Sequence, residues 1–304
     1  MNEVKRPTAW TVFFSVLTLA YLYPIALVVI NSFKAKIFIS TEPFSLPNAD
    51  TFVGFDNYLL GIQKTGLVEA FGWSLVITLG SAFWILLCTS MTAWWIVRVD
   101  NKYAKFLYLI FLFNLVVPFQ MVMFTLSWFA DYLGLGNPIG IWVVYLGFGA
   151  GLAVFIFTGF VKGIPRELEE AALIDGCGTV RMYFQVVLPI LKPAMVTVAI
   201  LEIMWLWNDY LLPSLVLDLR QYKTIPIAVQ YLRGGYGSVD MGAMMGVLVL
   251  AVAILPLLGV GGRQVFLSEI PGPMKDARLT PRITETAKVL WSVYAVLTVL
   301  CMIA

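Results

Sequence analysis

Histidine is absent from this 304-residue chain, and cysteine is almost absent. The three cysteines, Cys88, Cys177 and Cys301, stand at scattered spacings. Zinc sites and disulfide frameworks need clustered or regularly spaced Cys and His residues, so the sequence argues against both. Because there is no histidine base, and no Ser or Cys is paired with another base, the chain is also a poor fit to a membrane hydrolase.

Charged residues are scarce as well. Asp, Glu, Lys and Arg make up 12% of the chain, whereas 60% is hydrophobic and the mean hydropathy is +0.87. A water-soluble domain of this size does not need so many apolar side chains to fill its core. The formal net charge of +2 argues against a nucleic-acid partner. We therefore expect an all-α, polytopic membrane protein.

Long apolar runs define the expected transmembrane helices, because about 20 apolar residues are needed to cross the hydrocarbon core. Six runs satisfy this length, and a shorter seventh run gives a partial further segment. The six are residues 10–31, 73–97, 106–130, 139–161, 194–217 and 241–260, and the seventh is 289–304. The first run lacks a small-residue cleavage site, so we interpret it as a permanent span and not as a signal peptide.

Basic residues predict the orientation. Of the 20 Lys and Arg residues, 14 lie on the side that holds the N-terminus and the segments 98–105, 162–193 and 261–288. By the positive-inside rule this side is cytoplasmic, so the N-terminus is cytoplasmic and the segments 32–72 and 218–240 face outward. Aromatic residues near the span ends, including Trp94, Trp95 and Tyr103, are expected to be interfacial anchors.

The segment 163–193 interrupts the apolar pattern with charges, glycines and prolines. Pro165 stands near a helix start, and the acids within 167–170 fall in the first turns, where they complement the helix dipole. Gly176 is predicted to end this helix, and a second amphipathic helix is predicted to follow and to end at the prolines of 188–193. The pattern indicates a cytoplasmic helix-turn-helix that docks another protein. The alternative is a helical hairpin that lies on the bilayer.

One spacing in this segment is specific: E-A-A, three residues, G, nine residues and V-x-L-P. The residues that carry it are Glu170, Ala171, Ala172, Gly176, Val186, Leu188 and Pro189. This spacing resembles the EAA loop of bacterial ABC importer permeases, with Val186 where the family usually has Ile. In that family the EAA loop forms the coupling helices, which sit in a groove of the cytoplasmic ATPase subunit. The resemblance therefore implies that these residues couple the chain to an ATPase.

Two further segments, WNDYLLP at 207–213 and SFK at 32–34, resemble the carbohydrate-importer branch. The similarity covers about residues 7–247 and looks like the second permease subunit of maltose-type sugar importers. It implies an ATP-driven carbohydrate importer in the bacterial inner membrane, working by alternating access. The implied partners are a dimer of ATPase subunits, a second permease subunit and an extracytoplasmic sugar-binding protein, besides the lipid bilayer. ATP and Mg would be bound by the ATPase, because this chain lacks a G-x-x-x-x-G-K-[ST] loop and is expected to bind no cofactor or metal.

The C-terminal segment from about 249 to 301 instead resembles part of the membrane subunit of a Trk-type potassium transporter. We therefore expect a permease transmembrane domain at 1–247, with its coupling loop at about 163–193, and a Trk-like tail at 248–304 that also completes the sixth helix. An ion-conducting subunit is the alternative function, although the tail lacks a filter of carbonyl rings. A third alternative is a membrane adaptor, which would need no polar residues inside the membrane.

Five polar residues in or near the expected spans are candidates for the substrate path. They are Glu202, Asn208, Asp209, Asn114 and Gln120. A carboxylate inside a membrane is costly and often marks a translocation path, and Glu202 and Asp209 share a helix face. Asn114 and Gln120 bracket Pro118, where a broken helix could expose carbonyl groups. The alternatives are interhelical hydrogen bonding or a surface position for the acids, and packing at a kink for the amides.

Overall fold

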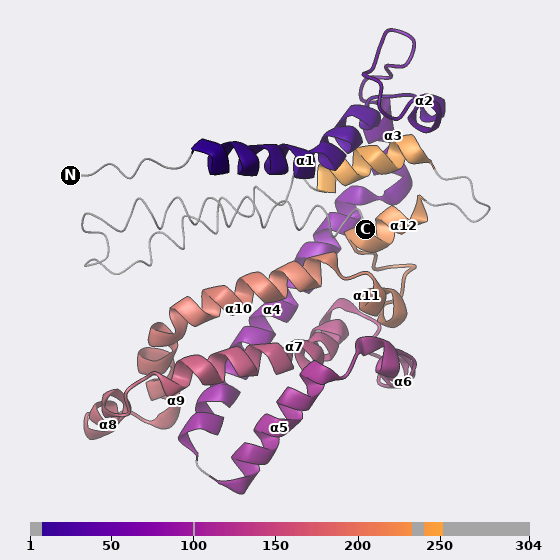
Figure 1. Ribbon diagram of the computed structural model, residues 1–304. Helices are drawn as coiled ribbons and strands as arrows, with labels where there is room; N and C mark the ends of the chain where they lie inside the picture. Colours follow the sequence, from indigo (N-terminus) through magenta and orange to yellow (C-terminus); the bar gives the residue numbers. More distant parts are fainter. Residues whose placement is uncertain (1–7, 100, 233–239, 252–304) are drawn as a thin grey trace. The chain divides into compact units, whose positions relative to one another are not determined.

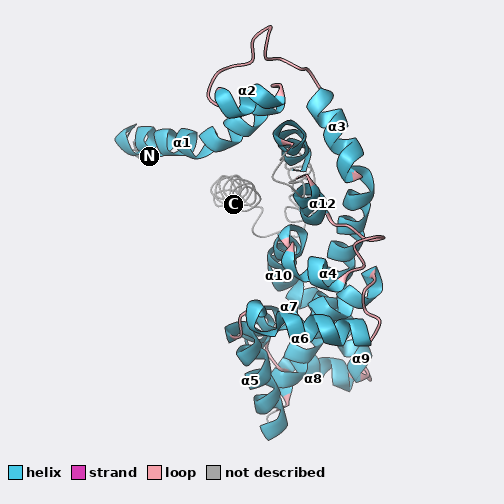
Figure 2. Cartoon of the chain, turned by 90° about the vertical axis from the view of Figure 1, so that its right-hand side faces the viewer, coloured by secondary structure: helices cyan, strands magenta, loops and turns pink. Residues whose placement is uncertain are grey.

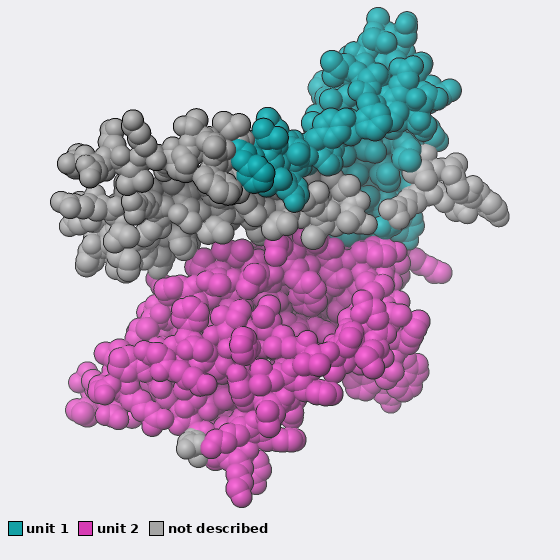
Figure 3. Space-filling model, viewed as in Figure 1, with its two compact units in different colours: residues 1–68, 225–304 teal, residues 69–224 magenta. Residues whose placement is uncertain are grey.

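The computed structural model describes residues 8–99, 101–232 and 240–251, and these residues form helices joined by turns and loops (Figure 1). The all-α expectation is confirmed for this part of the chain, in which the only β-pairing is an isolated bridge between Lys34 and Phe52. The chain divides into two compact units, residues 1–68 with 225–304, and residues 69–224 (Figure 3). The seventh apolar run, 289–304, lies outside the described residues.

The unit formed by residues 69–224 is a helical bundle. Its helices are α4 (Leu67–Arg98, from Glu69 onward), α5 (Lys102–Val116), α6 (Phe119–Tyr132), α7 (Pro138–Lys162), α8 (Glu167–Ile174), α9 (Thr179–Met182), a π-helical turn (Tyr183–Val187), α10 (Leu188–Asn208) and α11 (Leu211–Val216). Three of the described helical runs are long and apolar enough to cross a membrane: α4, α7 and the continuous run Thr179–Asn208.

The central helix of this unit is α7, which packs against both α5 and α10. It begins where Asn137 accepts hydrogen bonds from the backbone N–H groups of Ile139 and Gly140, with Pro138 in the first turn. Within the most apolar stretch of 18 residues in α7, half of the residues are buried inside the protein. Tyr145, Phe157 and Val154 are completely buried, so α7 supplies much of the core on which the other helices pack.

The expected third span, 106–130, is not one straight helix. It consists of α5 and α6, which are bent by 107° at a break over Val117 and Pro118. Proline has no backbone N–H and disfavours the helical conformation in the residue before it, so the chain turns there. The described residues therefore contain three spans, or four if the bent pair counts as one, and the predicted count of six is not reached within them.

The second amphipathic helix predicted for the segment 163–193 does not end at Leu188-Pro189 or at Lys192-Pro193, so that prediction was wrong. The helix runs without a break from Thr179 to Asn208. The prolines are accommodated because the turn Tyr183–Val187 is π-helical, which changes the hydrogen-bond register just before Pro189. The helix ends instead at Asp209, whose backbone is extended, and the expected fifth span at 194–217 is shifted accordingly.

The other unit contains helices from both ends of the chain. They are α1 (Thr8–Ser32), α2 (Lys36–Thr41), α3 (Asp56–Thr65), α12 (Ile225–Tyr231) and a helix over Met241–Ala251. The first of these agrees with the expected span 10–31, and the last covers the described part of the expected span 241–260. Figure 2 shows the loop that joins α2 to α3.

The SFK segment holds that loop in place. The hydroxyl groups of Ser32 and Tyr58 are 2.6 Å apart, and the Asn57 amide donates hydrogen bonds of 2.8 Å to the carbonyl groups of Ser32 and Lys34. The Lys34 side chain is fully buried, and its ammonium group donates to the Glu42 carbonyl at 2.8 Å. A buried lysine needs such partners, so this motif acts as a structural clamp between α1 and α3.

Candidate functional site

The predicted helix-turn-helix is present as α8, a turn and α9. Figure 1 shows these two helices at the end of the unit where α7 ends and α10 begins, with α6 and α11 at its opposite end. The first helix begins after Arg166 and carries Glu167, Glu169 and Glu170 in its first turn, as the sequence pattern predicts.

Gly176 ends α8 in a left-handed conformation, with a φ of 77°. The Gly176 N–H donates to the Leu173 carbonyl at 3.0 Å, and the Cys177 N–H donates to the Ala172 carbonyl at 2.9 Å. This pair of bonds is a Schellman motif, in which glycine is preferred because it has no Cβ. A Cβ at Gly176 would meet nothing within 4 Å in this chain, so its conformation, and not close packing, requires glycine here.

The two helices leave apolar side chains exposed. The exposed fraction is 86% for Ile174, 66% for Val180 and 55% for Leu173. Of the matched EAA residues, Ala172 is buried, whereas Glu170 and Ala171 are exposed. Further along, Leu188 is half-buried and Pro189 is exposed. Apolar residues exposed together at the end of a helical hairpin are typical of a surface that a partner covers.

The inner face of α8 is attached to α4 by a charged pair. The Arg98 guanidinium donates hydrogen bonds of 2.8 Å and 2.6 Å to Oε1 of Glu169, and a third of 2.9 Å to the Ile164 carbonyl. The Arg98 side chain is only 15% exposed and the Glu169 side chain only 10%. Such charge-assisted bonds are stronger than neutral ones, so α8 is held firmly against the end of α4.

A second contact attaches the π-helical turn to α4. The hydroxyl groups of Tyr183 and Ser90 are 2.6 Å apart, and the Tyr183 ring lies 5.7 Å from the Trp94 ring. Tyr183 is completely buried. Trp94 is half-buried, whereas Trp95 and Tyr103 are exposed. The loop is therefore attached to α4 at both of its ends.

Three of the five predicted path residues lie against one stretch of α7. The Asn114 amide donates to the Gly147 carbonyl at 2.6 Å, and Oδ2 of Asp209 accepts from the Tyr145 hydroxyl at 3.0 Å. Glu202 faces Gly149: a Cβ added to Gly149 would lie 2.9 Å from Oε2 of Glu202. The small glycines allow these close approaches between helices.

Glu202 is the most enclosed of these residues. It is 2% exposed, and its Oε2 has no hydrogen-bond partner within the described residues. The other acid, Asp209, also accepts from the Leu211 N–H at 3.0 Å and so caps α11. Asn208 donates to the Met204 carbonyl at 2.8 Å, but its side-chain oxygen is buried without a partner among the described residues. Gln120 is exposed on α6, and no hydrogen bond between described residues joins it to the other four.

Sequence reasoning did not identify the residues that hold these sites together. Arg98, Tyr183 and Tyr145 each pair with a residue more than 60 positions away in the chain. One signal was available for α8, because the period of a helix places Glu169 on the same face as Ala172, one turn later. That face is the one that turns toward the bundle.

A separate similarity concerns potassium transport. The Trk system potassium uptake protein of Halomonas elongata is 53% identical over 94 residues, which is 31% of this chain but only 16% of that protein. The match is longer than the segment 248–304, so part of it lies before residue 248.

The remaining comparisons concern permeases. A probable starch degradation products transport system permease protein of Thermoanaerobacterium thermosulfurigenes is 41% identical over 80% of this chain and 86% of its own length. A multiple sugar-binding transport system permease protein of Streptococcus mutans is 30% identical over 77% of this chain and 86% of its own length. A solved bacterial ABC transporter involved in the import of the acidic polysaccharide alginate has the same fold, with a TM-score of 0.70 at 19% identity over 87% of this chain and 96% of that chain.

The family described as binding-protein-dependent transport system inner membrane component matches residues 85–263, which is more than half of the chain. This range contains the whole helix-turn-helix and the buried acid of α10. The chain therefore belongs to the family of binding-protein-dependent transport system inner membrane components.

Proposed function

We propose that the chain is the permease subunit of an ATP-driven carbohydrate importer and that α8 and α9 are its coupling helices. The relatives named for starch degradation products and for multiple sugars support the carbohydrate class. The observation that carries the coupling role is the attachment of α8 to α4 through Glu169 and Arg98, with apolar side chains left exposed on α8 and α9.

This arrangement can transmit a movement. A docked ATPase subunit would push on the exposed residues, such as Leu173, Ile174 and Val180. Because α8 is fixed to α4, and the π-helical turn leads without interruption into α10, the push reaches two membrane helices at once. The matched residues Glu170, Ala171, Ala172, Gly176, Leu188 and Pro189 form the proposed coupling set. Each ligand must bind one conformation better than the other for such a movement to open a path.

The orientation follows from the charges. The segments 98–105 and 162–193 belong to the basic side of the sequence, so we place the coupling helices and the N-terminus in the cytoplasm. The membrane is then the bacterial inner membrane. The proposed partners are a dimer of cytoplasmic ATPase subunits that binds ATP and Mg, a second permease subunit and an extracytoplasmic sugar-binding protein.

Glu202 is the strongest candidate for the substrate path. A buried carboxyl oxygen without a partner among the described residues is costly inside a membrane, and such a group often marks a translocation path. Asn208 has a similar unpartnered oxygen, whereas Asp209 and Asn114 use their side chains to join helices. Gln120 stays in the proposed set because it is exposed and could face a path shared with the second permease.

The second candidate function is potassium transport, and the identity to the potassium uptake protein favours it. One experiment separates the candidates. The full chain is reconstituted in vesicles with its partner permease and ATPase, and ATP hydrolysis is measured with and without sugar-loaded binding protein. We expect sugar-dependent stimulation and no potassium flux. Potassium flux without sugar dependence would favour the second function, and ATPase docking with neither activity would identify an adaptor.

The domain boundary needs its own test. We propose that residues 1–247 form the permease and that 248–304 complete the sixth helix and add a tail. Deletion of the residues after Ser268 should then leave ATPase docking and sugar uptake largely unchanged. Loss of assembly on this deletion would place the tail within the working permease.

A further inference from the structure

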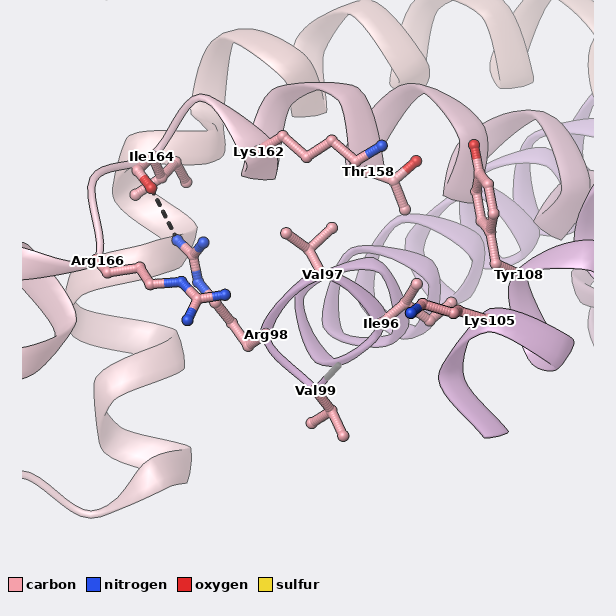
Figure 4. A pocket seen from close by; sticks show the side chains of 10 residues that line it. All are labelled: Ile96, Val97, Arg98, Val99, Lys105, Tyr108, Thr158, Lys162, Ile164 and Arg166. Atoms are coloured by element: carbon pink, nitrogen blue, oxygen red, sulfur yellow. Dashed lines mark hydrogen bonds between the residues drawn. The ribbon is translucent and has the colours of Figure 1, made fainter. Parts of the chain in front are cut away.

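A pocket with a basic wall lies at the same end of the unit as the coupling helices. It has a volume of about 490 Å³ and is open at one side. Figure 4 shows that its walls come from the end of α4, the start of α5, the end of α7 and the connection that leads to α8. This volume is within the usual range for small-ligand sites.

The polar part of the wall carries positive charge. Arg98, Lys105, Lys162 and Arg166 line the pocket, and no carboxylate is among its described lining residues. Arg98 is already bound by Glu169. Lys162 and Arg166 are exposed, and neither forms an ion pair with a described acidic residue. Several cations that line one cavity give it a positive potential, which favours an anionic ligand.

The rest of the wall is mostly apolar, and the hydroxyl of its one further polar residue, Thr158, donates to the Phe155 carbonyl at 2.8 Å. Ile96, Val97, Val99 and Ile164 contribute aliphatic side chains, and Tyr108 contributes a ring. A free phosphate ion would gain nothing from this surface, whereas the glycerol and first acyl carbons of a phospholipid would bury apolar area against it. The wall thus has two chemistries that match the two parts of an anionic lipid.

The level of the pocket in the membrane agrees with this occupant. Trp95 is 42% exposed and Tyr103 is 79% exposed, and both lie close in sequence to the pocket residues of α4 and α5. Exposed Trp and Tyr side chains near the ends of spans favour the headgroup region. On the cytoplasmic side, anionic lipids are attracted to basic residues in this region.

We propose that this pocket binds the phosphate headgroup of an anionic phospholipid through Lys162 and Arg166. Arg166 immediately precedes α8 and Ile164 accepts the hydrogen bond from Arg98, so a bound lipid contacts the segment that positions the coupling helix. The bilayer composition thereby influences how firmly that helix is held. The cytoplasmic placement of the pocket rests on the proposed function, but the headgroup contacts do not.

The test measures lipid binding directly, so it does not depend on transport. The full chain is purified in detergent and titrated with phosphatidylglycerol or with phosphatidylcholine, and the bound lipid is counted by native mass spectrometry. We expect preferential binding of phosphatidylglycerol. Lys162→Gln and Arg166→Gln should each weaken it by about fivefold. Lys102→Gln, which removes an exposed charge outside the pocket, is the matched control and should change it by less than about twofold.

Two further measurements separate a lipid site from a phosphate site and from a loss of folding. Lys162→Arg keeps the charge and should retain binding, and Arg166→Gln carries the test if Lys162→Gln does not fold. Inorganic phosphate at the same concentration should not displace the lipid. Equal binding of both lipids, an equal loss in Lys102→Gln, or displacement by inorganic phosphate would each overturn the proposal. Sugar-stimulated ATP hydrolysis can persist in any of these cases, so failure of the lipid site is distinguishable from failure of the proposed function.

Discussion

Arg98 at the end of α4 and Glu169 on α8 form an ion pair that is largely withdrawn from solvent, with N–O distances of 2.8 Å and 2.6 Å. The pair joins a membrane helix to the helix that we propose to dock the ATPase. Its energy depends on both partners being present, because a lone charge at this position would lose its compensation. The pair therefore offers a direct way to separate docking from coupling.

Glu169→Gln should uncouple the transporter. The substitution removes the charge that Arg98 binds, so we expect a loss of about 2–3 kcal/mol in the attachment of α8. ATP hydrolysis should become less dependent on sugar-loaded binding protein, while the ATPase subunit still copurifies. Glu167→Gln is the matched control, since Glu167 is exposed on the same helix. Equal effects of the two substitutions would show that the ion pair has no special role.

Gly176→Leu should weaken assembly with the ATPase while leaving membrane insertion intact. A side chain at a φ of 77° costs about 1–2 kcal/mol, which destabilises the turn between α8 and α9. Gly176→Ala should have nearly the same effect, because a Cβ there meets no neighbour. The yield of ATPase subunit that copurifies with each variant measures the loss of assembly.

Gly178→Ala provides the control for that prediction. Gly178 lies two residues further along, has a φ of −70°, and likewise has no atom within 4 Å of a Cβ position. Any L-residue adopts this conformation, so assembly should be unchanged. If Gly178→Ala impairs assembly as strongly as Gly176→Ala, the partner and not the turn requires the small residues.

The sequence predicted the local features of the coupling loop well. The acids in the first turn of α8 and the glycine at its end follow from rules that act over one helical turn, and both are observed. The prediction failed at Pro189 and Pro193, because a π-helical turn allowed the helix to continue through them. Such a turn depends on the packing of Tyr183 against α4, which no local pattern reveals.

The candidate path was less predictable for the same reason. Glu202 could be selected because a carboxylate in an apolar run is conspicuous in any sequence. Its neighbour Gly149 and the partner of Asp209, Tyr145, come from α7, and only the fold brings them together. Lys34 illustrates the opposite case, since a lysine after a span suggests exposure, yet its side chain is buried in a clamp of backbone carbonyl and hydroxyl groups.

The ion pair between Lys64 and Asp240 should contribute fully to stability above the usual Asp pKa of about 3.9 and progressively less at lower pH. Burial raises the pKa of Asp240, but hydrogen bonds from Lys64 and the Ala243 N–H, together with the charges of Lys64 and Lys36, outweigh it and lower the pKa below the usual value. A carboxyl group with a lowered pKa stabilises the folded state while it is ionised, and this contribution is lost as the pH falls through that pKa.

The expected size of this effect is small, because the Lys64 side chain is 52% exposed. Asp240→Asn should cost about 0–1 kcal/mol at pH 7. The difference from the parent chain should shrink as the pH falls below the usual Asp pKa of about 3.9 and through the lowered pKa. Thermal unfolding in detergent, followed from pH 7 to acidic pH, measures this difference. A destabilisation that does not shrink with falling pH would mean that Asp240 acts through its shape and not through its charge.

Glu202→Gln should lower sugar uptake per assembled complex more than it lowers the amount of complex. The amide keeps the size of the side chain beside Gly149, so the packing of α10 on α7 is retained, while the carboxyl chemistry is lost. Gly149→Ala is the packing control: its Cβ would come within 2.7 Å of Ile85 and 2.9 Å of Glu202, so complex yield and uptake should fall together. Uptake and complex yield are measured on the same vesicles. If Glu202→Gln leaves their ratio unchanged, Glu202 is a packing residue and does not belong to the sugar path.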